Sequence, residues 1–104
     1  MLKILSMMKR KEGLSIGEFR TWAVETHAKI GTRMPGIRHY RVCVVTDDHA
    51  DSPYDAVFEL YFDNEADFKA ALGSDVGAEA GADIKAHCED NRFRLMTEET
   101  IIIE

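Results

Sequence analysis

The chain has 104 residues, of which 45% are hydrophobic and 31% are charged, and its formal net charge is −6. This length suits one domain over residues 1–104 with a modest core. The acidic balance argues against a nucleic-acid partner, because phosphate binding needs a basic surface, and no apolar run approaches the roughly 20 residues that span a bilayer.

The N-terminal third predicts a strand followed by a helix. Residues 2–9 are rich in Leu, Ile and Met, which is typical of a strand covered on both faces. Ser15-Ile16-Gly17-Glu18 then forms a capping box, so a helix is predicted from Ile16 to about Thr32. His27 follows the apolar spacing of this helix and falls on its buried side or at its edge. The apolar stripe consists of Ile16, Phe19, Trp22, Ala23 and Ile30.

Two strands are predicted next. Pro35-Gly36 stops the helix, and residues 37–46 read as a strand. Alternation places Tyr40 with Val42 and Val44 on one face of this strand, and His39 on the other. Residues 54–62 alternate cleanly: Glu59 and Tyr61 share the more polar face, and the other face carries Tyr54, Ala56, Phe58, Leu60 and Phe62.

The C-terminal part predicts two helices and a last strand. Asp63 or Asn64 caps a helix through Leu72, and Ser74 or Asp75 starts another helical piece. Residues 91–103 supply the last strand or strands. The order of strand, helix, two strands, helix and strand predicts an α+β ferredoxin-like βαββαβ fold, with an antiparallel sheet and helices on one face.

The second face of such a sheet has to be covered. We expect it to be apolar, with Tyr40, Val42 and Val44 among its residues, and an exposed apolar sheet favours aggregation. A self-complementary homodimer through the sheet faces is the simplest cover, which predicts a dimeric α+β barrel.

Several segments together resemble the EthD domain family of dimeric α+β barrels. They are Lys9 to Ser15, Glu18-Phe19-Arg20, Trp22, His27-Ala28 and Pro35 to Tyr40. The resemblance implies a ferredoxin-like subunit that pairs through its sheet, and a pocket between sheet and helices for a small hydrophobic or aromatic ligand. A related lactone methylisomerase has a helix-borne histidine that falls on His27 and a tyrosine that falls on Tyr40. Its strand cysteine falls on Leu60, so its full chemistry is not implied.

His27 and Tyr40 are the candidate catalytic residues. A histidine titrates near neutral pH and can act as general acid or base. Spacing alone favours a core-edge histidine bonded to a backbone carbonyl, and only the family resemblance makes the two interpretations about equal. Tyr40 could orient a ligand carbonyl or could be a strand aromatic with its hydroxyl at the rim. Trp22 is interpreted as core or as pocket wall, with core favoured. Glu59 and Tyr61 are weaker candidates for ligand binding, because a solvated edge pair is the favoured interpretation for them.

Metal, nucleotide and thiolate sites are not predicted. His87-Cys88 does not have a chelating spacing, and His49 with Asp51 lacks further ligands. There is no phosphate-binding glycine loop, so no cofactor is expected. Cys43 and Cys88 are too few for a disulfide framework, which predicts reduced thiols in a cytoplasmic protein.

The sequence therefore predicts a cofactor-independent enzyme that moves a proton on a small hydrophobic or cyclic metabolite, of isomerase or cyclase type. Two alternatives stay open. One is an oxidoreductase, either a cofactor-free monooxygenase or an accessory to oxidative degradation. The other is a non-catalytic small-molecule binding protein.

Overall fold

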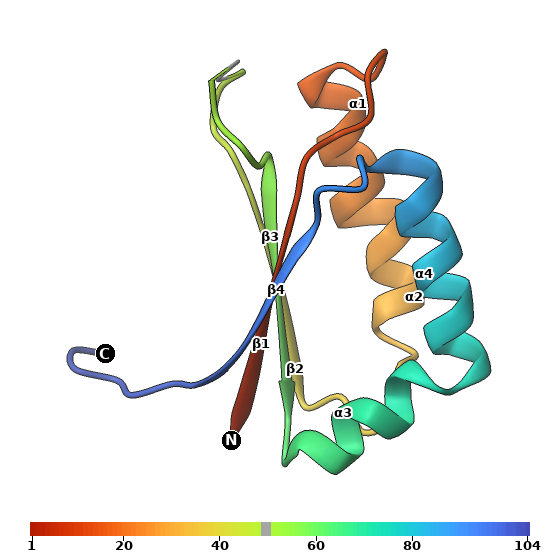
Figure 1. Cartoon of the computed structure of the whole chain (residues 1–104). Coiled ribbons are helices and arrows are strands. Elements are labelled where there is room, and N and C mark those ends of the chain that lie inside the picture. Colours follow the sequence, from red (N-terminus) through yellow and green to blue (C-terminus); the bar gives the residue numbers. More distant parts are fainter. Residues whose placement is uncertain (49–50) are drawn as a thin grey trace.

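The computed structural model describes residues 1–48 and 51–104, which form an antiparallel four-stranded sheet with helices on one face (Figure 1). The strand order is β2-β3-β1-β4. This is the predicted α+β ferredoxin-like arrangement. The elements are β1 (Leu2–Met8), α1 (Ile16–Thr21), η1 (Trp22–His27), α2 (Ala28–Gly31), β2 (His39–Val44), β3 (Ala56–Phe62), α3 (Glu65–Leu72), α4 (Asp75–His87) and β4 (Phe93–Glu98).

The first helix begins and ends where the sequence predicts, but its middle is π-helical. The Ser15 hydroxyl accepts from the Glu18 amide at 3.0 Å, and the Glu18 carboxylate accepts from the Ser15 amide at 2.9 Å. The helix then runs through α1, η1 and α2 to its C-cap at Thr32. The π segment η1 carries Trp22 and His27 on a wider turn, and such segments often occur at functional sites.

The predicted faces of β2 are inverted. Tyr40, Val42 and Val44 pack against the core beneath the helices, whereas His39 and Cys43 are exposed on the open face. The prediction that the first three residues help to form the uncovered face is wrong. Both faces of β2 carry apolar residues, so its own alternation cannot decide which face is inside. The phase comes from pairing with β3, whose Phe58 lies beside Val42 and is 2% exposed.

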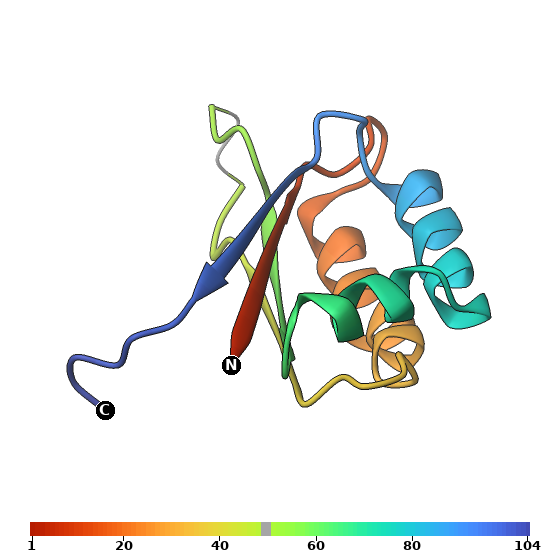
Figure 2. The same cartoon turned by 60° about the horizontal axis from the view of Figure 1, so that its bottom comes forward.

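The last strand is shorter than predicted. β4 ends at Glu98, and Ile101, Ile102 and Ile103 lie outside the sheet with exposed fractions of 61%, 85% and 91%. Figures 1 and 2 both show this C-terminal segment leaving the sheet on the side opposite the helices. These three residues therefore add no apolar contact to the core of their own subunit.

The core has two clusters, and the partly buried Leu60 of β3 packs against both. Phe19, Trp22 and Phe58 belong to one part, and Phe62 and Phe68 belong to the other. The helices α3 and α4 follow the predicted caps, because Asn64 and Ser74 each accept a hydrogen bond from an amide of the first turn. None of the described helices is long and apolar enough to cross a membrane.

Candidate active site

A cavity of about 120 Å³ lies between the sheet and the helices. Its volume exceeds what one water needs several times over, so it has room for a small organic molecule. Polar groups reach it from three directions: His27 from η1, Tyr40 from β2, and two arginines from the start of β4. The remaining wall is mainly apolar and includes Met8, Met34, Phe58, Leu60, Phe68, Leu72, Ala80 and Ile84.

His27 is 3% exposed, and its ring is paired with a carboxylate. Its Nδ1 lies 2.8 Å from Oδ2 of Asp83 on α4, so the predicted alternative of a backbone carbonyl partner is not what the structure has. Among the described residues, no fully enclosed side-chain nitrogen or oxygen lacks a hydrogen-bond partner. Since no described residue bonds to His27 Nε2 and the residue lines the cavity, Nε2 opens on the cavity.

Asp83 is the site residue that sequence reasoning missed. Its Oδ2 also accepts from Trp22 Nε1 at 3.0 Å, and its backbone carbonyl lies 2.7 Å from Nδ1 of His87. The sequence contained one signal for it: Asp83 is an acidic residue that directly precedes Ile84, which belongs to the apolar stripe of the helix. Its partners, however, are 61 and 56 positions earlier in the chain, so only the packing of η1 against α4 reveals the contact.

Burial lowers the pKa of His27 below its usual value, although the Asp83 carboxylate acts in the opposite direction. The imidazole is therefore neutral at neutral pH. With Nδ1–H donating to the carboxylate, the lone pair on Nε2 faces the cavity. This is the protonation state of a general base.

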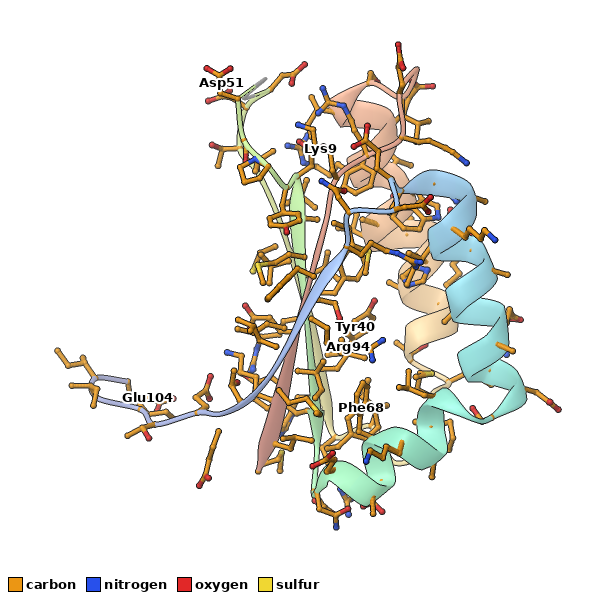
Figure 3. The ribbon with its side chains drawn as sticks, viewed as in Figure 1. Lys9, Tyr40, Asp51, Phe68, Arg94 and Glu104 are labelled. Atoms are coloured by element: carbon orange, nitrogen blue, oxygen red, sulfur yellow. The ribbon has the colours of Figure 1, made fainter. Side chains whose placement is uncertain are left out.

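Tyr40 lines the same cavity, and its ring is seated against a glycine. An added Cβ at Gly31 would lie 2.5 Å from Cε2 and 3.0 Å from the hydroxyl oxygen of Tyr40. Burial raises the pKa of Tyr40, so the phenol stays protonated and can donate a hydrogen bond. Figure 3 shows Tyr40, Arg94 and Phe68 on the helix side of the sheet.

Gly31→Ala is expected to destabilise the protein. The methyl group gains about 1 kcal/mol of helix propensity, but overpacking against the Tyr40 ring costs about 1–3 kcal/mol. Urea unfolding should therefore show a net loss of about 1 kcal/mol. The matched control is Gly81→Ala on α4, where an added Cβ meets nothing within 4 Å and stability should rise. Equal stability of the two variants would contradict a required close approach at Gly31.

The other predicted site residues lie elsewhere. Trp22 is core, as favoured: it is 5% exposed, and its ring packs at a tilt against His27 with a centroid distance of 4.9 Å. Glu59 and Tyr61 lie on the open face of the sheet, where both contact Lys3. They line a separate hollow together with Arg41 and Glu99, so the sheet separates them from His27 and Tyr40.

Neither cysteine has the properties of a nucleophile. Burial raises the pKa of the Cys88 thiol to about 12 and also raises the pKa of Cys43. Both are free thiols. Over residues 1–48 and 51–104 no group of His, Cys, Asp and Glu is arranged to hold a metal ion, and His49 lies outside the described residues. Leu60, at the position of the relative's cysteine, contributes only apolar wall to the cavity.

Comparison with known proteins gives one family and a consistent fold. The EthD domain family matches residues 11–90. An ethyl tert-butyl ether D family protein from Bacillus halodurans is similar in structure, with a TM-score of 0.79 and 22% identity over 96% of this chain and 99% of that one. No curated protein matches the sequence significantly.

Two further solved structures share the fold. A dimeric ferredoxin-like protein of unknown function from Thermobifida fusca has a TM-score of 0.73 and 15% identity, over 92% of this chain and 88% of that one. An antibiotic biosynthesis monooxygenase has a TM-score of 0.69 and 17% identity, over 97% of this chain and all of that one. At these identities the likeness establishes the fold alone.

Proposed function

Because the chain belongs to the EthD domain family, we propose that it is a cytoplasmic, cofactor-independent enzyme that transfers a proton on a small, mainly apolar cyclic molecule. The observation that carries this proposal is the His27–Asp83 pair, 2.8 Å apart, with Nε2 of His27 open to a cavity of about 120 Å³. A structural histidine would also need a hydrogen-bond partner for its buried ring, but it would not need a second ring nitrogen that opens on a cavity.

The proposed reaction uses three side chains. His27 Nε2 removes a proton from a carbon next to a substrate carbonyl, and the electron pair of the broken C–H bond moves onto the carbonyl oxygen. Asp83 stabilises the imidazolium that forms, and the Tyr40 hydroxyl donates to the new oxyanion. His27 then returns the proton to another atom of the same molecule, which completes an isomerisation with no net gain or loss of electrons. For a ring closure, the enolate carbon first attacks a second carbonyl carbon of the same molecule, the π pair of that carbonyl moves onto its oxygen, and His27 returns the proton to this oxygen.

Deuterium exchange tests this proposal without knowledge of the product. The protein is incubated in D₂O with separate unsaturated lactones, cyclic ketones and phenols, and loss of each C–H signal is followed by proton NMR. Proton transfer by His27 Nε2 predicts enzyme-dependent exchange at one carbon of at least one compound class. If no compound exchanges faster than in buffer while several bind in the cavity, the non-catalytic binding protein is the better description.

Oxidation is the second candidate reaction, and it would use the same general base, His27. Deprotonation of an electron-rich phenol by His27 gives an anion that can transfer electrons to molecular oxygen, and the mainly apolar wall would hold such a ring. The monooxygenase that shares the fold is consistent with this option. An oxygen electrode separates the two reactions, because oxygen uptake with a phenol supports oxidation and exchange without uptake supports isomerisation.

We propose further that two copies pair through their open sheet faces. Leu5, Met7 and Val57 lie half-buried on this face, and Phe93 and Leu95 are 51% and 41% exposed there. A continuous apolar strip on a sheet surface is self-complementary across a two-fold axis. The exposed segment Ile101–Ile103 leaves the subunit on the same side (Figure 2) and would gain cover from the second copy.

Leu95→Asp is expected to separate the subunits. The side chain is exposed within one subunit, so its fold should tolerate the change, whereas a carboxylate buried between two sheets should raise the dimer dissociation constant about 100-fold. Sedimentation velocity at micromolar concentration measures this shift. Val24→Asp, at a 47% exposed site on η1, is the matched control and should leave the dimer intact. A wild-type monomer would refute the pairing.

A further inference from the structure

One end of the cavity is cationic, although the protein as a whole is acidic. Arg92 and Arg94 both line the cavity, and the same two residues line a groove of about 340 Å³ that continues from it past Phe93. The formal net charge of the chain is −6, so the positive charge at this end of the cavity is a local feature and not part of a generally basic surface. A local pair of guanidinium groups at the mouth of an apolar pocket raises the local concentration of anions.

Among the described residues these two arginines have no acidic partner, in contrast to Arg10, Arg33 and Arg38. Arg33 and Arg38 each form an ion pair with a carboxylate, and Arg10 forms two. In the part of the chain that the structure describes, neither Arg92 nor Arg94 forms an ion pair or donates a hydrogen bond, although Asp90 lines the same groove. Their N–H groups are therefore available to a ligand.

The fold holds Arg94 over the cavity. It lies on the inner face of β4, directly opposite Ser6 of β1. Its guanidinium carbon is 5.2 Å from the centre of the Phe68 ring, a cation–π contact that keeps the side chain on the helix side of the sheet (Figure 3). Ser6 lines the same end, and its hydroxyl bonds to no described residue, so it adds a third donor.

The geometry points to a carboxylate-binding subsite formed by Arg94, Arg92 and Ser6, and hence to a ligand that is a small organic acid with an apolar ring. A guanidinium binds a carboxylate through two parallel hydrogen bonds, which fixes orientation as well as position. This inference rests on the proposed function in one respect: it assigns the carboxylate end of the substrate to the arginines and leaves the reacting carbon for His27. Arg94 is then the specificity-determining residue that selects acids over neutral analogues.

Benzoate and benzamide are the probes, because they have the same ring and differ in charge. Chemical-shift titration of the ¹⁵N-labelled protein at low salt should give at least about tenfold tighter binding of benzoate, with shifts at residues that line the cavity. Added salt should weaken benzoate binding and leave benzamide unchanged, since only the former depends on charge.

Arg94→Gln should lower the affinity for benzoate about tenfold and change that for benzamide less than about twofold. Arg92→Gln should have the same selectivity with a smaller loss. Arg38→Gln, which removes an exposed arginine paired with Asp63, is the matched control and should change neither affinity. Equal binding of the two probes, absence of benzoate binding at cavity residues, or equal effects of Arg94→Gln and Arg38→Gln would overturn the subsite.

The outcome is separable from that of the proposed reaction. Binding of benzoate requires no turnover, so the subsite can be established even if no compound exchanges deuterium. Conversely, exchange of neutral ketones by a protein that binds benzoate and benzamide equally would support His27 as the base and overturn the assignment of an acidic substrate.

Discussion

Replacing His27 with glutamine is expected to reduce kcat for deuterium exchange by about 10²–10⁴-fold, the usual contribution of a positioned general base. Glutamine can still donate to Asp83 but cannot take a proton from carbon at neutral pH. The measurement is the exchange rate of the fastest compound of the panel, with thermal unfolding and benzoate binding followed in parallel. Stability and binding should change little compared with turnover.

His87→Gln is the matched control for this loss. His87 also bonds to Asp83, but it does not line the cavity, and its side chain is 32% exposed. Its replacement should leave kcat within about threefold, because a general base must lie within hydrogen-bond reach of the proton that it abstracts. If His27→Gln fails to fold, His27→Ala with added imidazole provides the second arm, and recovery of exchange would identify the missing base. A folded His27→Gln variant with normal exchange would contradict the mechanism.

Asp83→Asn is expected to reduce kcat by a comparable factor, about 10²–10⁴-fold, while leaving His27 in place. An asparagine amide can donate to Nδ1, which favours the tautomer that carries its proton on Nε2. That tautomer cannot act as a base toward the cavity. Asp83 is therefore a positioning residue, and its effect should appear in kcat more than in KM.

The pH profile of the Asp83→Asn variant distinguishes positioning from mere packing. Burial lowers the pKa of His27 and Asp83 partly restores it, so removal of the carboxylate charge should lower this pKa further. Activity that depends on neutral imidazole is lost as pH falls through the pKa of His27, and the acidic limb should move to lower pH in the variant. The NMR titration of the His27 ring measures the same shift directly. A limb that stays in place would show that Asp83 acts only through packing.

Local signals allowed much of the fold to be predicted. The Ser15 capping box and the Asn64 and Ser74 caps mark helix starts that depend only on residues within one turn. The alternation of residues 54–62 correctly separated the inner face of β3, with Phe58 buried, from the face of Glu59 and Tyr61. The resemblance to the EthD domain family is confirmed by the match over residues 11–90.

Features that depend on distant partners were not predictable in this way. The phase of β2 is decided by β3, and Asp83 acquires its role only because α4 packs across η1. The run Ile101–Ile103 has strand-like composition, but it pairs with no strand among the described residues of its own subunit. The amino-acid composition of Trp22–His27 does not predict a π-helix, because the spacing of its apolar residues is equally compatible with an ordinary α-helix. The roles of His27 and Tyr40 stay predictions, although the structure places both on one cavity.

The position of Trp22 has an optical consequence. It is the sole tryptophan of the chain, and its indole contacts two imidazoles, with ring centroids 4.9 Å from His27 and 4.7 Å from His87. Protonated imidazole quenches indole emission at contact distance, and the Asp83 hydrogen bond to Nε1 adds sensitivity to the charge of that carboxylate. The intrinsic fluorescence of the unmodified protein should therefore report protonation and ligand binding at the site, with no label and no second tryptophan to obscure the signal.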